Sequence, residues 1–364
     1  MRIGLITHNS YALEEPMFGG LEAFTYDLVL ELKTRGHELI IFGVRGSAEK
    51  IGSLPCLSPS SMISNAYSEA DFCSLAHREY LQIMLSVDLY GLDVLFNNSL
   101  HYVPPTMATS IRTPMLTVLH TPPIPELNEA YAYPNVGGYL CSPSHANARN
   151  WSELISACEV IPNAVDLELW RPRGARSTSA IWSGRIVPEK GLHLAMDAAR
   201  IANIPLRIAG PISDPVYHEQ YIQPRLGVDT TYLGHLSRPA LAAEVAHASV
   251  ALVTPCWEEP FGLVVAEALA CGTPVAGFHR GALPELVTSD IGVLVEPDDV
   301  AALAGAIWSA VALSSDRCRL MAESRWSFKE QVSRYEAALS KVAQCRPIKN
   351  PKRYPNGSAG LPTN

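Results

Sequence analysis

Residues 257–277 read "WEEPFGLVVAEALACGTPVAG", and this stretch sets the architecture of the chain. An apolar helix is predicted over about 260–271, because Pro260 favours a first helical turn and the segment Gly272–Pro274 supplies a glycine cap and a proline stop. A short apolar strand candidate follows at 273–277. A helix that leads directly into such a strand is typical of a parallel α/β sheet.

The same alternation of short apolar runs and helical patterns extends in both directions. The strand candidates are 3–7, 37–43, 93–96, 114–119, 158–161, 179–184, 205–210, 230–234, 249–255, 273–277 and 291–295. Residues 162–178 are polar and contain several Pro and Gly residues, as interdomain linkers do. We therefore predict two tandem, doubly wound Rossmann-like α/β domains, over 1–168 and 169–327, that face each other across a cleft.

The C-terminal part of the chain divides into a helix and a tail. The helical pattern over 328–345 has an apolar stripe that needs a partner, and we expect it to return to the first domain. Residues 346–364 are rich in Pro and Asn and are expected to form a solvated tail.

Composition excludes several classes of protein. A formal net charge of −8 argues against a nucleic-acid partner. No apolar run approaches the length of a membrane span, and the N-terminus turns polar too early for a signal peptide, so a soluble, cytoplasmic protein without strong membrane association is expected. The eight cysteines are scattered without a Cys-x-x-Cys pair, which argues against zinc and against a disulfide framework.

Two glutamates in the opening stretch need an explanation. Glu267 lies within the apolar run, where burying a carboxylate is costly unless a polar group meets it. Glu259 precedes the predicted helix. The N-terminus of that helix, where Gly262 carries no side chain, offers free N–H groups to an anion. Carboxylates on either side of an anion would accept hydrogen bonds from hydroxyl groups, which suits a nucleotide sugar. The structural alternative is a cap-like Glu259 and a Glu267 held in an ion pair.

The segment "EPFGLVVAE" resembles the Glu-x7-Glu signature of retaining GT-B glycosyltransferases of glycosyltransferase family 4. Other segments resemble that family in the same order along the chain: "FGGLEAF", "LHTP", "CSPSHA", "IPNAVD", "SGRIVPEKG", "YLGHLS" and "GALPELV". The resemblance implies transfer of a hexose from a nucleotide sugar to a hydroxyl of a saccharide, lipid-linked or small-molecule acceptor. A UDP-sugar, such as UDP-glucose, is favoured over a GDP-sugar. The second domain would bind the donor and the first domain the acceptor.

The resemblance also assigns roles to individual residues. In the catalytic set, Glu259 would contact the donor sugar, and Arg185 and Lys190 would bind its diphosphate. His120, at the end of a predicted strand, would contact the sugar, and Glu267 would hold the ribose. The donor-binding residues implied in this way are Gly19, Gly20, Ser183, Arg185, Lys190, Gly210, His235, Leu236, Glu259, Pro260, Phe261, Gly262, Leu263 and Glu267.

The sequence contains no Asp-x-Asp of the kind that holds a metal ion in other sugar transferases. Arg185, Lys190 and the helix N-terminus can stabilise charge on the leaving diphosphate instead, so neither a metal nor another cofactor is expected. First-domain loops at 44–66 and 121–138 are expected to shape the acceptor site, although nothing in them names the acceptor.

Other functions remain open at this point. A nucleotide-sugar epimerase or a phosphorylase of the same fold is one alternative, and a non-catalytic nucleotide-sugar sensor is another. A phosphorylase would need a lysine-bound pyridoxal phosphate and normally a longer chain. The pair Gly19–Gly20 does not fit Gly-x-Gly-x-x-Gly and no Walker motif occurs, so dehydrogenases and nucleotide hydrolases lose their main support.

Overall fold

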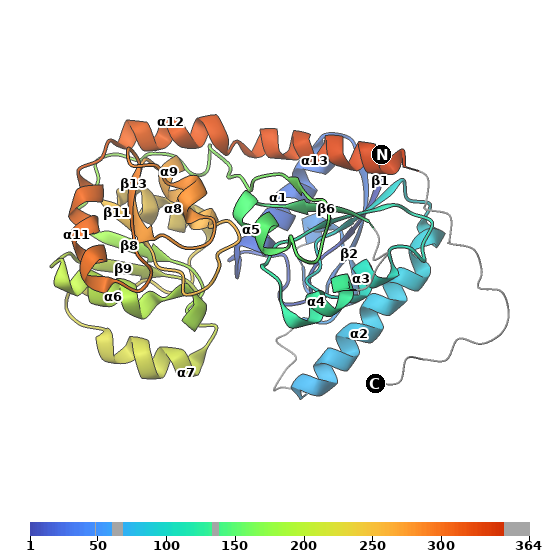
Figure 1. The fold of residues 1–364 in the computed structure, drawn as a ribbon, viewed down its shortest axis with the longest axis horizontal. Helices are drawn as coiled ribbons and strands as arrows, with labels where there is room; N and C mark the ends of the chain where they lie inside the picture. The colour runs from blue at the N-terminus through green and yellow to red at the C-terminus, as the bar shows by residue number, and fades with distance from the viewer. Residues whose placement is uncertain (48, 60–67, 133–137, 346–364) are drawn as a thin grey trace.

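The computed structural model of the protein describes residues 1–47, 49–59, 68–132 and 138–345. These residues form two α/β domains that lie side by side (Figure 1). Each domain contains one sheet in which every strand pairing is parallel. The strand order is β3-β2-β1-β4-β5-β6-β7 in the first sheet and β10-β9-β8-β11-β12-β13 in the second. The predicted fold class is confirmed.

The strands of the first sheet are β1 (Arg2–Ile6), β2 (Glu38–Val44), β3 (Leu54–Leu57), β4 (Val94–Asn97), β5 (Met115–Val118), β6 (Tyr139–Ser142) and β7 (Glu159–Val160). Those of the second are β8 (Ala180–Ser183), β9 (Leu206–Ala209), β10 (Thr230–Tyr232), β11 (Val250–Val253), β12 (Val275–Phe278) and β13 (Gly292–Val295). The central strands β4, β5, β11 and β12 are buried along their whole length, as expected of a parallel sheet covered on both faces.

Two strands were not predicted from the sequence. β3 contains Pro55, which cannot donate to a strand ladder and is tolerated here because β3 lies at the edge of the sheet. β6 follows Gly138 and is short and partly polar, so its pattern did not distinguish it from a loop.

The helices are α1 (Gly20–Thr34), α2 (Glu69–Ser86), α3 (Val103–Met107), α4 (Pro125–Ala132), α5 (His145–Asn150), α6 (Leu192–Ile201), α7 (Pro215–Tyr217), α8 (Arg238–His247), α9 (Leu263–Ala270), α10 (Leu283–Leu286), α11 (Val300–Val311), α12 (Ser315–Arg325) and α13 (Phe328–Ala343). In the first domain, α1 and α13 share one core with the sheet, and α2 and α3 share another. In the second domain, α6 and α11 cover one face of the sheet, and α8, α9 and α12 cover the other.

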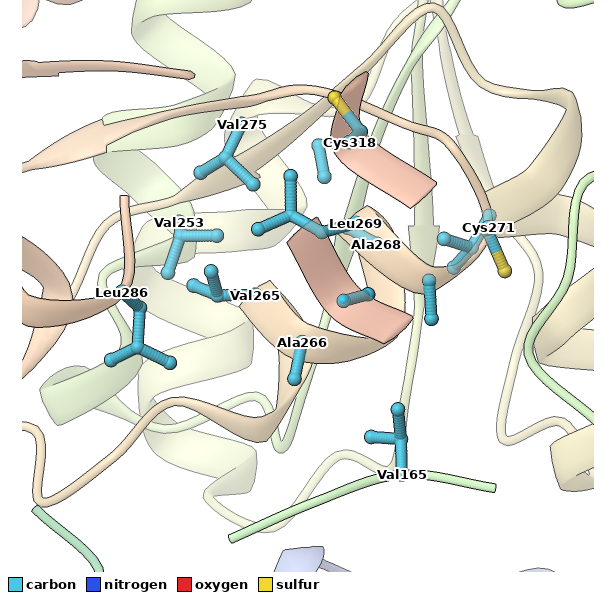
Figure 2. Close-up of a cluster of buried hydrophobic side chains, with 14 of the residues drawn as sticks. Val165, Val253, Val265, Ala266, Ala268, Leu269, Cys271, Val275, Leu286 and Cys318 are labelled. Carbon is cyan, nitrogen blue, oxygen red and sulfur yellow. The ribbon is translucent and has the colours of Figure 1, made fainter. Parts of the chain in front are cut away.

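Helix α9 lies at the centre of the second domain. Figure 2 shows its residues Val265 and Leu269 surrounded by Val253 of β11, Val275 of β12 and side chains from neighbouring segments. A helix that is apolar on nearly every side is expected to be buried. Its one carboxylate must therefore be accommodated at the remaining open side.

The predicted start of this helix is wrong. α9 begins at Leu263, and Pro260 and Phe261 belong to the loop before it. Gly262 has a φ of 91°, in the left-handed region, so it cannot continue a helix and serves as the N-cap. Glu259 consequently lies on a loop one turn further from the helix than the sequence pattern indicated.

The chain passes between the domains twice, at 161–179 and at Trp326–Phe328. The two segments contact each other, because Val165 and Ser327 form a parallel bridge. The backbone N–H of Val165 donates to Trp326 O at 3.1 Å, and that of Phe328 donates to Val165 O at 3.3 Å. The two passages thus form one paired connection between the domains.

After the second passage, α13 packs on the first sheet and beside α1 (Figure 1). Tyr335 is fully buried there, with its ring centroid 5.7 Å from that of Phe24 and 5.4 Å from that of Phe96. The expected tail, 346–364, lies outside the described residues, as do parts of both expected acceptor loops, at 60–67 and 133–137. A search of the described residues found no helix with the length and hydropathy of a membrane span.

Candidate functional site

A cavity of about 330 Å³ lies between the domains, within the range of small-molecule sites. Residues that follow β1 and β5 line it from the first domain, and residues that follow β8, β9 and β11 line it from the second. Every predicted site residue lines this cavity: Gly19, Gly20, His120, Ser183, Arg185, Lys190, Gly210, His235, Leu236, Glu259, Pro260, Phe261, Gly262, Leu263 and Glu267. The strand order of each sheet reverses beside β1 and β8, where open parallel sheets bind ligands.

Lys190 and Glu259 form an ion pair inside the cavity. Lys190 Nζ lies 2.6 Å from Glu259 Oε2, and the Trp257 indole N–H donates to the same oxygen at 2.8 Å. The ammonium also lies over the Trp257 ring, 5.1 Å from its centroid. Glu259 is only 9% exposed. These contacts fix the carboxylate in one orientation. The pairing of the two predicted residues was not expected from the sequence.

Close backbone packing holds both members of this pair. Gly191, which follows Lys190, has a positive φ, and a Cβ there would collide with the Thr254 carbonyl. Gly281 also has a positive φ, and a Cβ there would collide with the Glu259 backbone. The N–H of Ala282 donates to Glu259 O at 2.9 Å. The "GALPE" segment therefore positions the loop that carries Glu259.

Glu267 is different, because its carboxylate makes no hydrogen bond or ion pair with the described residues. It projects from the second turn of α9 on the same side as Leu263, and both line the cavity. Burial raises the pKa of Glu267 to about 7; Arg238 lowers it and Asp27 raises it further. No described cation forms the ion pair with Glu267 that the structural alternative expected. A carboxylate without a partner in a cavity marks a candidate ligand site.

Arg238, at the start of α8, reaches across to the first domain. Its guanidinium donates to Glu15 Oε1 and to Asp27 Oδ2, both at 2.5 Å, and lies 5.4 Å from the centroid of the Tyr26 ring. The side chain is 15% exposed. We call Arg238, Glu15 and Asp27 the interdomain clamp. Nothing in the sequence pattern indicated it.

The predicted glycine loop lies where the two domains approach each other. A Cβ at Gly20 would be 2.8 Å from Leu263 Cδ1, at the start of α9. A Cβ at Gly19 would be 3.9 Å from Arg185 Cδ. The Arg185 guanidinium itself has a long, 3.5 Å contact with Glu189. The absence of side chains at both glycines thus leaves room between the start of α1 and the cavity residues of the second domain.

His120 and His235 are both engaged within the protein. His120 Nε2 lies 2.7 Å from Asn98 Oδ1, and burial, with a smaller contribution from His8, lowers the pKa of His120 to about 3. His120 is therefore neutral at physiological pH. His235 Nε2 donates to Met17 O at 2.9 Å, across the domain boundary.

Helix α5 of the first domain also contacts loops of the second domain that lie before α9 and at α10. The Ser144 hydroxyl, which caps α5, donates to Pro260 O at 2.6 Å. The next backbone N–H, of His145, donates to Glu285 Oε2 at 3.0 Å. Glu285 thus has a structural role at the domain boundary, and the "CSPSHA" segment contacts the Glu259 loop directly.

Sequence reasoning missed several residues of the cavity, above all His8, Glu22, Trp257 and Arg238. His8 follows β1 at its carboxyl end, which is the same signal that selected His120 after β5, so it could have been found. Glu22 and Trp257 carried no comparable signal.

Residues 175–325 match the family model described as glycosyl transferases group 1. The second domain belongs to that family. Lys190, Glu259 and Glu267 all lie within the group 1 domain, whereas His120 and the loop Gly19–Gly20 come from the part of the chain before it.

Curated relatives match only part of the chain. Glycogen synthase of Mycobacterium tuberculosis is 35% identical over 164 residues, which are 42% of this chain and 39% of the relative. D-inositol 3-phosphate glycosyltransferase of Kribbella flavida is 34% identical over 165 residues, which are 38% of this chain and 39% of the relative. The chain thus spans about two fifths of the length of these relatives.

Solved structures match the whole two-domain fold. Sucrose-phosphate synthase of Thermosynechococcus elongatus superposes with a TM-score of 0.76 at 19% identity, over 94% of this chain and 98% of that chain. HepE of Anabaena in complex with UDP-glucose gives a TM-score of 0.72 at 18% identity, over 94% and 100%. The group 1 domain and its partner domain therefore together adopt the GT-B fold.

Proposed function

We propose that the protein is a retaining, metal-independent glycosyltransferase that moves a hexose from a nucleotide sugar to a hydroxyl of an acceptor. The observation that carries this proposal is one cavity in which the Lys190–Glu259 pair and the unpartnered Glu267 flank the N-terminus of α9. The helix N-terminus and the cations suit a diphosphate, and the carboxylates suit hydroxyls on either side. The group 1 family match supports the same reaction class.

In the proposed reaction, the acceptor hydroxyl attacks the anomeric carbon from the face that the leaving phosphate departs from. The new C–O bond forms as the bond to the phosphate oxygen breaks, and that phosphate takes the proton of the hydroxyl. Negative charge grows on the diphosphate, where Lys190, Arg185 and the α9 N-terminus stabilise it. Glu259, already oriented by Lys190 and Trp257, accepts hydrogen bonds from the donor sugar, and Glu267 accepts them from the ribose.

The donor is proposed to be a UDP-sugar, UDP-glucose first, in preference to a GDP-sugar. The shared fold with HepE, solved with UDP-glucose, supports this choice. Calorimetric titration with UDP, GDP and ADP tests this choice, and tighter binding of GDP or ADP would reverse the order of preference.

Incubation with the donor alone then separates the function classes. A transferase slowly releases sugar to water, an epimerase converts the donor to its epimer, and a sensor leaves the donor intact.

Metal independence has a separate test. Transfer is expected to continue at full rate in EDTA, because Arg185, Lys190 and the helix N-terminus supply the positive charge. Activity that EDTA abolishes and that magnesium or manganese restores would show that these groups do not suffice.

A further inference from the structure

The first-domain wall of the cavity contains buried polar groups that make no hydrogen bond with the described residues. His8 Nε2 is one, although the residue is only 3% exposed and lines the cavity. The hydroxyl of Thr121, which follows His120 on the same wall, is another. The Asn98 side-chain nitrogen, behind His120, is a third. Buried polar groups are normally hydrogen-bonded, so a cluster of unpartnered groups at one cavity wall indicates a ligand that supplies the missing bonds.

The proton on His8 can be assigned from its neighbours. His8 Nδ1 accepts a hydrogen bond from the backbone N–H of Ser10 at 3.1 Å, so the ring proton is on Nε2. Burial lowers the pKa of His8, Glu22 opposes this shift, and Arg185 adds to it, so the ring is neutral at pH 7. Nε2 lies 3.3 Å from Glu22 Oε1 but makes no hydrogen bond, so its N–H is not directed at the carboxylate. It remains available as a donor.

Glu22, on the first turn of α1, complements this donor with an acceptor. Its side chain is 6% exposed and makes no hydrogen bond with the described residues. A Cβ at Gly19 would lie 3.0 Å from Glu22 Oε2 and 3.9 Å from Arg185 Cδ, so the pair lies close to the proposed diphosphate residues. A ligand group that contacts both His8 and Glu22 must accept one hydrogen bond and donate another, and a hydroxyl group does both.

The charge of this wall restricts the ligand further. Among the described residues that line the cavity, the cations Arg185, Lys190 and Arg238 all come from the second domain. The first domain contributes Glu22 as its charged side chain and no lysine or arginine. An anionic group placed against this wall would face a buried carboxylate, which is unfavourable in a cavity of low dielectric, and the nearby cation Arg185 belongs to the proposed diphosphate site.

We propose that Glu22 and His8 form the acceptor subsite and that the acceptor is an uncharged, hydroxyl-rich molecule, a neutral saccharide or polyol. This inference rests on the proposed transferase function and assigns its acceptor class. Glu22 accepts a hydrogen bond from one acceptor hydroxyl, and His8 Nε2–H donates to the same or a neighbouring oxygen. Phosphorylated or carboxylated acceptors are disfavoured by Glu22.

The test is a set of paired acceptors assayed with the donor that calorimetry selects. Maltotriose, methyl α-glucoside and myo-inositol are compared with glucose 6-phosphate and inositol phosphate, and nucleotide release above the acceptor-free rate is measured. We expect kcat/KM to be at least ~10-fold higher for the neutral members, because one unfavourable buried charge contact costs roughly that factor. Preference for the phosphorylated members, with normal donor hydrolysis, would overturn this inference and leave the transferase function intact. Absence of both donor binding and donor hydrolysis would overturn both.

Variants identify the subsite itself. Glu22→Gln keeps the shape of the side chain and removes its charge, and it is expected to raise acceptor KM by ~10-fold. His8→Asn keeps an acceptor for the Ser10 N–H but removes the Nε2 donor, and it is expected to raise the acceptor KM by a similar factor. In both variants the donor KM and the acceptor-free hydrolysis should change less than the acceptor KM. Glu31→Gln, on the same helix and paired with Arg35, is the matched control and should behave as wild type. Unchanged acceptor KM in both subsite variants, each folded by its melting curve, would refute the assignment.

Discussion

At the scale of single residues, the two glutamates of the opening stretch are in opposite situations. Glu259 is held by Lys190 and Trp257, whereas Glu267 has no partner among the described residues. The sequence predicted that both would face one cavity, because a carboxylate within an apolar helix needs an open side. It could not predict the pairing with Lys190, which depends on two loops that are 69 residues apart. It also missed the interdomain clamp, since side chains from different domains leave no local pattern.

Lys190 is expected to act mainly in the transition state. Lys190→Ala should lower kcat by ~10²- to 10³-fold even at saturating donor, because the charge on the leaving diphosphate grows as the bond breaks. Lys190→Arg should restore only part of the activity. Lys329→Ala, an exposed lysine on α13, is the control. Full kcat at high donor concentration would instead assign Lys190 to ground-state binding.

The ion pair adds a second expectation for Lys190. Glu259→Gln and Lys190→Ala should be strongly non-additive, with the double variant only slightly slower than the more impaired single variant. The measurement is a double-mutant cycle on kcat. Independent, additive losses would mean that the two residues act separately despite their 2.6 Å contact.

Glu267 is expected to make donor binding depend on pH. Its pKa is about 7 in the free protein, and hydrogen bonds from ribose hydroxyls favour the ionised form, so its pKa falls when the nucleotide sugar binds. Affinity should therefore rise with pH up to about 7 and level off above it, by at most ~10-fold per pH unit. Calorimetry with UDP-glucose near pH 6.5, in two buffers of different ionisation enthalpy, should detect the release of protons on binding.

Glu267→Gln is the control for this pH dependence, because the amide cannot titrate. It should bind UDP-glucose with nearly the same affinity across the range. If the variant keeps the slope of the wild type, another group is responsible.

At the scale of elements, the apolar runs and the glycine and proline signals predicted most strands, because parallel strands buried on both faces leave continuous apolar segments. The edge strand β3, with its proline, did not fit this pattern. The helix α9 was placed three residues too early, because Pro260 is compatible with a first turn whereas the backbone angle of Gly262 cannot be read from a sequence. The loop positions that build the site depend on such angles.

Gly281 illustrates this dependence at the loop before α10. Gly281→Ala should destabilise the protein by at least ~1 to 2 kcal/mol, because an L-residue at positive φ is strained and its Cβ meets the Glu259 backbone. Activity should fall as well, since the loop that carries Glu259 must move. Gly305→Ala is the matched control. Gly305 lies within α11 with no atom near its added Cβ, so alanine there should stabilise by about 0.5 to 1 kcal/mol in thermal melts. Destabilisation by both would contradict the packing argument.

At the scale of the whole molecule, the site exists only because the domains lie face to face. The clamp, the contact between Ser144 and Pro260, and the close approach of Gly20 to Leu263 all cross the cleft. The sequence predicted a cleft from the two-domain pattern, but it carries no information on which side chains meet across it. Those contacts depend on the relative orientation that the paired connection allows.

Arg238→Gln is expected to loosen this arrangement. Loss of the charge-assisted hydrogen bonds to Glu15 and Asp27 should destabilise the face-to-face arrangement of the domains by ~1 to 3 kcal/mol. The donor KM should therefore rise ~10- to 100-fold. The radius of gyration measured by solution scattering should increase. Arg207→Gln, which removes an ion pair with Glu244 inside the second domain, is the control and should change neither quantity. An unchanged KM in Arg238→Gln would mean that the clamp does not govern donor access.

The return of α13 to the first sheet has a consequence for biosynthesis. The first domain begins at the N-terminus, yet its core lacks Tyr335 and the rest of α13 until the ribosome has translated the entire second domain. The second domain is continuous in sequence between the two passages and can bury its own core as soon as α12 has emerged. Nascent domains usually fold in the order in which they are made. In this chain the half that is translated first is completed last, and it spends that interval with one face of its sheet only partly covered.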